Sequence, residues 1–108
     1  MKLLSRSEEL ILLAIWKLQD EAYGIAIREH LVRATGRSWS IGAVYVPLDK
    51  LVKLGYIRSL QAPPTPERGG RSKRYFSVTK QGLAALNEVR LIHDAMWADL
   101  PNLTPGLT

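Results

Sequence analysis

The segment Arg68–Thr79, RGGRSKRYFSVT, restricts the fold of this chain more than any other. Three cations, Arg71, Lys73 and Arg74, lie between a glycine turn and an aromatic stretch, and Lys73–Val78 favours a β-strand. Tyr56–Gln61 is also strand-like, and a link rich in proline and glycine joins the two stretches. The pair predicts a single two-stranded ribbon. Since an isolated hairpin is marginal in water, the rest of the chain must supply a core on which it packs.

Two helical patterns precede the ribbon. Ser5 and Glu8 have the spacing of a capping box, which predicts a first helix over Ser5–Leu18. This helix is apolar nearly all round, so we expect it to be buried on more than one side. A second helix is predicted over Tyr23–Thr35, where Gly36 provides a natural C-terminal stop.

A third helix is predicted over Ile41–Leu54, with Ser40 as its N-cap. Spacing residues at intervals of 100° predicts a buried face made of Ile41, Val44, Tyr45, Leu48, Leu51 and Val52. The opposite face then consists of Gly42, Ala43, Val46, Lys50 and Lys53. Pro47 conflicts with this assignment, because an interior proline costs a helix about 3 kcal/mol.

The last helix is predicted over Lys80–Asp99, with Thr79 as its N-cap. Its polar strip is narrow, and its apolar band is broader than one small domain needs: Leu86, Val89, Ile92, His93, Met96, Trp97 and Leu100. Residues 101–108 are expected to form a flexible tail. The predicted domain organisation is therefore 1–79 for a helix-and-ribbon domain, 80–100 for a separate helix and 101–108 for the tail.

Charge and composition narrow the possible functions. The net charge is +5, and residues 61–80 hold five cations against one anion, whereas residues 81–108 hold one cation against three anions. Such asymmetry favours a basic docking face. There is no cysteine, and the two histidines lie far apart, so we expect no metal site and no cofactor. Since no nucleophile–base pair or phosphate loop is visible, we do not expect an enzyme.

The apolar run Leu10–Trp16 follows two basic residues, as the apolar core of a signal peptide would. It is too short to span a bilayer, which takes about 20 residues, and no small-residue cleavage site follows it. We therefore expect a cytoplasmic protein with no membrane partner.

The order of three helices, a ribbon and a helix predicts a mainly α fold with a two-stranded β-wing, the layout of a winged helix-turn-helix with one added C-terminal helix. In such domains one helix enters the major groove of DNA and the wing follows the backbone. Gly42 and Ala43 would let the start of the third helix approach base edges, and Val46 is placed to touch a thymine methyl group. The alternative is that Gly42 and Ala43 are small for packing within the protein.

Three segments share the spacing of a known family. They are AYGIAI at Ala22–Ile27, GAVYVPLDKLVKLGYI at Gly42–Ile57 and GGRSKRYFSVTKQG at Gly69–Gly82. On these residues the chain resembles the PadR family of bacterial transcriptional regulators. The family pattern places a proline inside the third helix, which accounts for Pro47. Ala43 and Val44 stand where the family usually has Thr-Leu, so no operator sequence is transferred.

The resemblance implies a homodimer that binds double-stranded DNA at a palindromic site, usually as a repressor. The residues expected to contact DNA are Ser40, Gly42, Ala43, Tyr45, Val46, Lys50, Arg71, Lys73 and Arg74. The residues expected in a dimer interface are Leu86, Val89, Ile92, Met96 and Trp97. His93, Met96 and Trp97 also form a candidate pocket for a small aromatic effector, although the interpretation of Trp97 as an interface anchor is favoured. The alternative function is a winged helix that docks proteins and does not read DNA.

Overall fold

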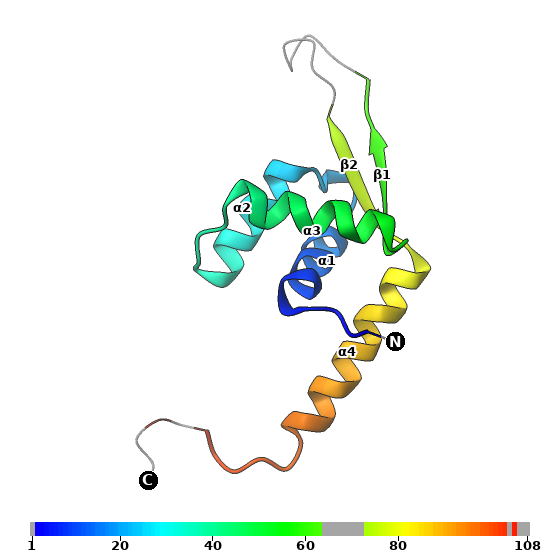
Figure 1. Ribbon diagram of the computed structural model, residues 1–108. Coiled ribbons are helices and arrows are strands. Elements are labelled where there is room, and N and C mark those ends of the chain that lie inside the picture. The colour runs from blue at the N-terminus through cyan, green and yellow to red at the C-terminus, as the bar shows by residue number, and fades with distance from the viewer. Residues whose placement is uncertain (1, 64–72, 104, 106–108) are drawn as a thin grey trace.

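The computed structural model describes residues 2–63, 73–103 and 105. Its elements, in chain order, are α1 (Arg6–Leu18), the 3-10 turn η1 (Gln19–Glu21), α2 (Gly24–Thr35), α3 (Ile41–Lys53), β1 (Ile57–Gln61), β2 (Arg74–Val78) and α4 (Lys80–Trp97) (Figure 1). This arrangement confirms the predicted winged-helix fold with one additional C-terminal helix. Each predicted element is present, with ends that differ by one or two residues.

The ends of the first two helices follow from local chemistry. The capping box is complete, because the Ser5 hydroxyl accepts from the Glu8 amide at 3.1 Å and the Ser5 amide donates to Glu8 Oε1 at 2.7 Å. Helix α2 ends at Gly36, which adopts a left-handed conformation with φ of 66°. That conformation is easily reached by glycine and lets the helix close its last turn.

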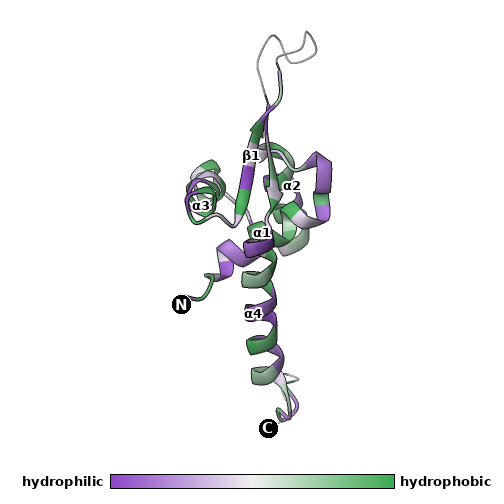
Figure 2. Ribbon diagram, turned by 90° about the vertical axis from the view of Figure 1, so that its right-hand side faces the viewer, coloured by the Kyte–Doolittle hydropathy of each residue, from purple (hydrophilic) through white to green (hydrophobic). Residues whose placement is uncertain are grey.

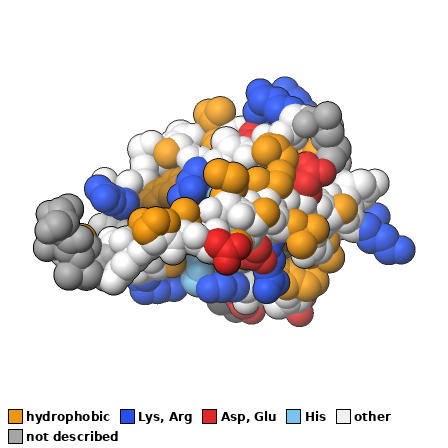
Figure 3. Space-filling model, turned by 90° about the horizontal axis from the view of Figure 1, so that it is seen from below, with side chains coloured by type: hydrophobic (Ala, Val, Ile, Leu, Met, Phe, Trp, Pro, Cys, Tyr) orange, Lys and Arg blue, Asp and Glu red, His pale blue; other side chains and the backbone are white. Residues whose placement is uncertain are grey.

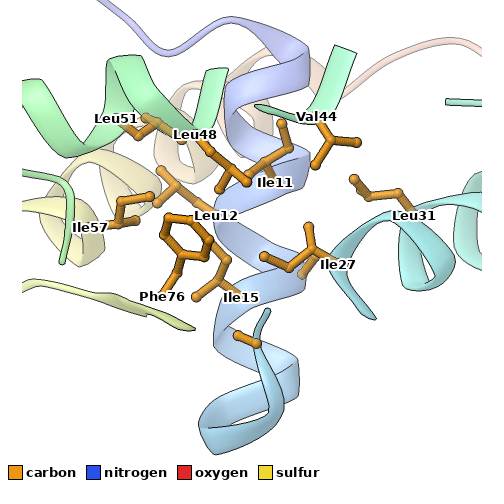
Figure 4. Close-up of a cluster of buried hydrophobic side chains, with 12 residues drawn as sticks. Ile11, Leu12, Ile15, Ile27, Leu31, Val44, Leu48, Leu51, Ile57 and Phe76 are labelled. Carbon is orange, nitrogen blue, oxygen red and sulfur yellow. The ribbon is translucent and has the colours of Figure 1, made fainter. Parts of the chain in front are cut away.

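The core forms around α1, which lies between the other elements (Figure 4). Side chains from α1, α2, α3 and both strands meet there, and the largest fully buried ones are Ile11, Leu12, Ile15, Ile27, Leu31, Leu48, Leu51, Ile57 and Val44. Leu13 and Trp16 stay exposed on the other side of α1. Since α1 packs against α2, α3, β2 and α4, the expectation that it is buried on more than one side is confirmed, and Leu13 and Trp16 mark the part of its surface that stays exposed.

The ribbon is antiparallel, with Ile57 opposite Val78 and Gln61 opposite Arg74. Its base is joined to the start of α2, where the Phe76 amide donates to the Ala22 carbonyl at 2.8 Å and Tyr23 forms a bridge with Tyr75. The wing is thus fixed to the helical body through β2.

Helix α4 extends away from the body as a stalk (Figures 1 and 2). It starts at Thr79, whose hydroxyl accepts from the Gly82 amide and donates to the Gly55 carbonyl. The first half of the stalk packs on the body through Gly82, Ala85 and Val89, and the second half leaves it. Among the described residues, no helix has the length and apolar character needed to cross a membrane.

Candidate nucleic-acid interface

Helix α3 presents its N-terminal half to solvent. Ser40 caps it, since its hydroxyl accepts from the Ala43 amide at 3.0 Å. Gly42, Ala43 and Val46 are exposed, as predicted for the outer face, and Val46 is 70% exposed. In the described part of the chain, a Cβ at Gly42 would meet no atom within 4 Å. Packing within the described protein therefore does not require a residue as small as glycine at position 42. The start of α3 is open to a ligand.

Ile41 differs from its predicted place in the buried face of α3, whereas Tyr45 lies in that face as predicted. Ile41, predicted in the buried face, is 67% exposed, because it is the first residue of α3 and extends past the elements that pack on the helix. Tyr45 is half-buried and packs against the core, with its hydroxyl close to Gly24. Its ring is therefore largely committed to the contact between α2 and α3.

Lys50, predicted to contact DNA, binds an acid of its own chain. Its Nζ lies 2.8 Å from Oε2 of Glu8, a buried carboxylate in the capping box of α1. Burial raises the pKa of the Glu8 carboxyl, but hydrogen bonds from Lys50 and Ser5 and the charge of Lys50 outweigh it, so that the pKa is lowered overall. Glu8 therefore stays ionised and holds Lys50 against α1.

Two cations of the wing, Lys73 and Arg74, also have partners within the chain. Arg74 lies 3.1 Å from Asp49 of α3 and 4.9 Å above the ring of Phe76, and Lys73 lies 4.0 Å above the ring of Tyr23. These contacts orient both cations at the junction of the wing with α2 and α3. Arg71, the third predicted contact, lies outside the described residues.

The turn before α3 contains positioning residues that the sequence analysis missed. Arg28 Nε donates to the Trp39 carbonyl at 2.6 Å, and the Trp39 ring nitrogen donates to the Thr35 hydroxyl at 3.1 Å. These bonds fix the start of α3 relative to α2. The signal that could have identified them is the large tryptophan in a short polar connection between two helices.

The predicted dimer residues of α4 divide into two groups. Leu86 and Val89 pack on their own chain, and Val89 is only 6% exposed. Ile92, Met96 and Trp97 are exposed, the last two by 71% and 64%. Seen from the end toward which α4 points, hydrophobic side chains are spread over this face among charged ones (Figure 3). A free surface for a partner therefore begins near Ile92, while Leu86 and Val89 mainly attach α4 to the body.

A groove of about 290 Å³ lies between α1 and α4, lined by Glu9, Leu13, Trp16, Leu83, Leu86, Asn87, Arg90 and His93. His93, predicted to face an effector, lines this groove and lies 3.4 Å from Glu9. Met96 and Trp97 are not among the lining residues. The aromatic wall comes instead from Trp16, which the sequence analysis placed inside a buried helix.

Comparisons with known proteins agree with this geometry. The model of the transcriptional regulator PadR-like family matches residues 11–88. A transcriptional regulator from Clostridium thermocellum superposes with a TM-score of 0.70 at 20% identity, over 83% of this chain and 82% of that one. A PadR family transcription regulator from Clostridium difficile R20291 gives 0.62 at 26% identity, over 85% and 95%.

The fold also occurs in a larger protein. The Aeropyrum pernix ORC1 protein, in complex with DNA, superposes with a TM-score of 0.62 at 22% identity, over 85% of this chain and 26% of that one. No curated protein matches the chain.

Proposed function

Because the chain belongs to the PadR-like family of transcriptional regulators, we propose that it binds double-stranded DNA as a homodimer at a palindromic operator and represses transcription there. The start of α3 is expected to enter the major groove, and the wing is expected to follow the phosphate backbone. Membership of the family establishes that the chain is a transcriptional regulator. We propose in addition that it binds DNA, forms a dimer and represses transcription.

The observation that carries the proposal is the exposed start of α3 beside the basic wing. Gly42, Ala43 and Val46 leave a narrow, open helix end, and Lys73 and Arg74 lie at the adjacent edge of the ribbon. Small side chains let a helix backbone approach base edges, and cations displace the counterions of DNA. The Aeropyrum pernix ORC1 protein, of which 26% superposes on this fold, has a structure in complex with DNA.

The dimer is proposed to form through the projecting half of α4. Met96 and Trp97 are large, apolar and mostly exposed on a helix that has left the body of the protomer. Leu13 and Trp16 of α1 extend the same kind of surface toward the body. Exposed apolar residues at this density are typical of an interaction site. A two-fold dimer would place its half-sites about 34–36 Å apart.

An effector site is a second part of the proposal. The groove between α1 and α4 offers an aromatic wall, Trp16, with polar groups from Glu9 and His93. A small flat aromatic molecule could stack there, and in a dimer Met96 and Trp97 could close over it. If Trp97 instead anchors the dimer interface, the effector would contact Trp16 and His93 but not Trp97. Quenching of tryptophan fluorescence in Trp16→Phe and Trp97→Phe variants separates the two arrangements.

A salt series of duplex binding tests the proposed function. We expect binding at low salt, with log K falling linearly with log salt. Arg71→Ala combined with Arg74→Ala should weaken binding to every duplex and flatten that slope, since both side chains are proposed to contact phosphates. The absence of any duplex binding at low salt would favour the alternative, a winged helix that docks proteins.

A further inference from the structure

We propose that α3 reads its operator through thymine methyl groups, with Ile41 and Val46 as the residues that determine sequence preference. This inference rests on the proposed DNA binding and adds the chemical class of base that the helix selects. The two side chains are 67% and 70% exposed, so the protein itself leaves them without cover.

The composition of α3 offers few side chains that read bases by hydrogen bonds. The side chains that make bidentate contacts with base edges are arginine or lysine for guanine, and asparagine or glutamine for adenine. The sequence of α3, IGAVYVPLDKLVK, contains no arginine, asparagine or glutamine. Its polar side chains are therefore limited to Tyr45, Asp49 and the two lysines, Lys50 and Lys53.

Most of these polar side chains already have partners within the chain. Asp49 binds Arg74 at 3.1 Å, and Lys50 binds the buried Glu8 at 2.8 Å. Tyr45 is half-buried against α2. Lys53 belongs to the last turn of the helix, far from its exposed start. The Ser40 hydroxyl caps the helix by accepting from the Ala43 amide at 3.0 Å. Apart from Ser40, the exposed groups at the start of α3 are the backbone of Gly42 and the apolar side chains of Ile41, Ala43 and Val46.

The major groove of DNA contains one apolar group that suits these side chains. The thymine C5-methyl is the only apolar group in the donor and acceptor pattern of its floor. Ile41 and Val46 are five residues apart, which is roughly 7.5 Å along a helix, or about two base-pair steps, and about 140° around it. With the start of α3 inserted in the groove, the two side chains would therefore meet bases on different sides of the helix. Gly42 between them adds no bulk that would hold the helix away. We therefore expect each half-site to place thymine methyls opposite these two residues.

Removing single methyl groups from the DNA tests this proposal. Duplexes are first selected with the full-length protein from a random pool, and each thymine of the best duplex is then replaced by deoxyuridine, which lacks only the methyl. Burial of one methyl predicts about fourfold weaker binding at each contacted thymine, and roughly fifteenfold when both halves of the palindrome are changed. Positions that α3 does not contact should be unaffected.

Protein variants test whether Ile41 and Val46 are the residues that contact the thymine methyl groups. In Val46→Ala and Ile41→Ala, replacing the thymine opposite the changed residue with deoxyuridine should weaken binding much less than it does in the wild type. In Val32→Ala, a matched valine truncation on α2, the same DNA substitutions should weaken binding as much as in the wild type. Since both residues are exposed, circular dichroism should show native folding. Tight binding that no uracil substitution changes by more than about 1.5-fold would overturn this inference and leave DNA binding intact. Failure to select any duplex would instead overturn the proposed function on which it rests.

Discussion

Gly82 and Gly42 differ in the space that the surrounding atoms leave for a side chain. At Gly82, near the start of α4, an added Cβ would overlap the carbonyl oxygen of Tyr56, which is backbone and cannot turn aside. At Gly42 the same atom would enter open space. Gly82 therefore permits α4 to approach the chain that leads into β1. Gly42 makes no such close approach within the described part of the protomer.

These settings predict opposite effects on stability. Gly82→Ala should lower the free energy of unfolding by about 1–3 kcal/mol, because a well-packed contact must be forced apart. Gly42→Ala should leave it unchanged or raise it by up to about 1 kcal/mol, because alanine is the better helix former. Chemical denaturation of both variants measures the difference. Equal effects at the two sites would contradict the close approach at Gly82.

Glu8 makes part of the stability depend on pH. Its folded-state pKa is lowered below the ordinary 4.5, mainly by hydrogen bonds with Lys50 and Ser5 that outweigh burial. A lowered pKa means that the stabilising contribution is complete above the ordinary value and is lost as the pH falls through the folded value. Glu8→Gln should therefore be less stable than the wild type at neutral pH, and the gap should narrow below about pH 4.5.

Thermal unfolding from pH 3 to pH 7 would measure this gap, with Glu88→Gln as a matched control on α4. The control should show no comparable narrowing. A gap between wild type and Glu8→Gln that stays constant across the acidic range would mean that Glu8 stabilises the fold through its shape and not through its charge.

At the scale of elements, local signals explain which helices and strands could be predicted. Ser5, Ser40 and Thr79 each cap a helix, and Gly36 ends one, so the chemistry that fixes these ends lies within a few residues of the boundary. The contacts that position the elements could not be predicted, because their partners lie far apart in the sequence. Asp49 and Arg74 are 25 residues apart, and nothing local to either residue indicates the other.

The same limit explains what helical periodicity could not show about α3. Helical periodicity placed Ile41 with the core because it gives only a direction around the axis, and it does not say where along the axis the packed neighbours end. Contact of Lys50 with DNA stays a prediction, and its ion pair with Glu8 was not predicted. A pattern read on one helix contains no information about an acid on another.

The pair of Asp49 and Arg74 connects the proposed reading helix to the wing. Both side chains are partly exposed, so the pair should contribute no more than about 1 kcal/mol to folding. Asp49→Asn removes a negative charge near the proposed path of the phosphates and frees Arg74. We expect stronger DNA binding at low salt and a steeper dependence on salt, by up to about one phosphate contact.

Asp94→Asn is the matched control for this experiment. It removes the same charge from an exposed ion pair on α4, where Asp94 lies 3.9 Å from Arg90. Since α4 is not proposed to touch DNA, its effect on binding should be much smaller. Weaker binding by Asp49→Asn would indicate that Asp49 is needed to aim Arg74.

In the whole molecule, α1 connects the surface proposed for DNA with the helix proposed for dimerisation. Glu8 binds Lys50 of α3, and the next residue, Glu9, lies beside His93 of α4. The groove between α1 and α4 opens next to Glu9. An effector in that groove would therefore contact α1, a helix that touches both α3, which is proposed to bind DNA, and α4, which is proposed to form the dimer.

The whole-molecule prediction concerns the free half of α4. Met96→Glu and Trp97→Glu add charge to side chains that are 71% and 64% exposed, so neither should disturb the protomer. If these residues lie in the dimer interface, burying a carboxylate there should dissociate the dimer, because an unpaired charge is costly to remove from water. Leu86 and Val89 are unsuitable for this test, since they pack on their own chain and their substitution would also unfold it.

Sedimentation velocity would give the oligomeric state, with Leu60→Glu as the control. Leu60 is 72% exposed on β1, so it receives the same charge at a similar exposure away from α4. The control should sediment with the wild type, and the α4 variants should sediment as monomers. These monomers should also lose most of their affinity for a palindromic duplex while keeping weak binding to a half-site, because each subunit then pays its own association cost. Variants that remain dimeric and bind the palindrome normally would place the interface elsewhere, with the side of α1 around Leu13 and Trp16 as the next surface to alter.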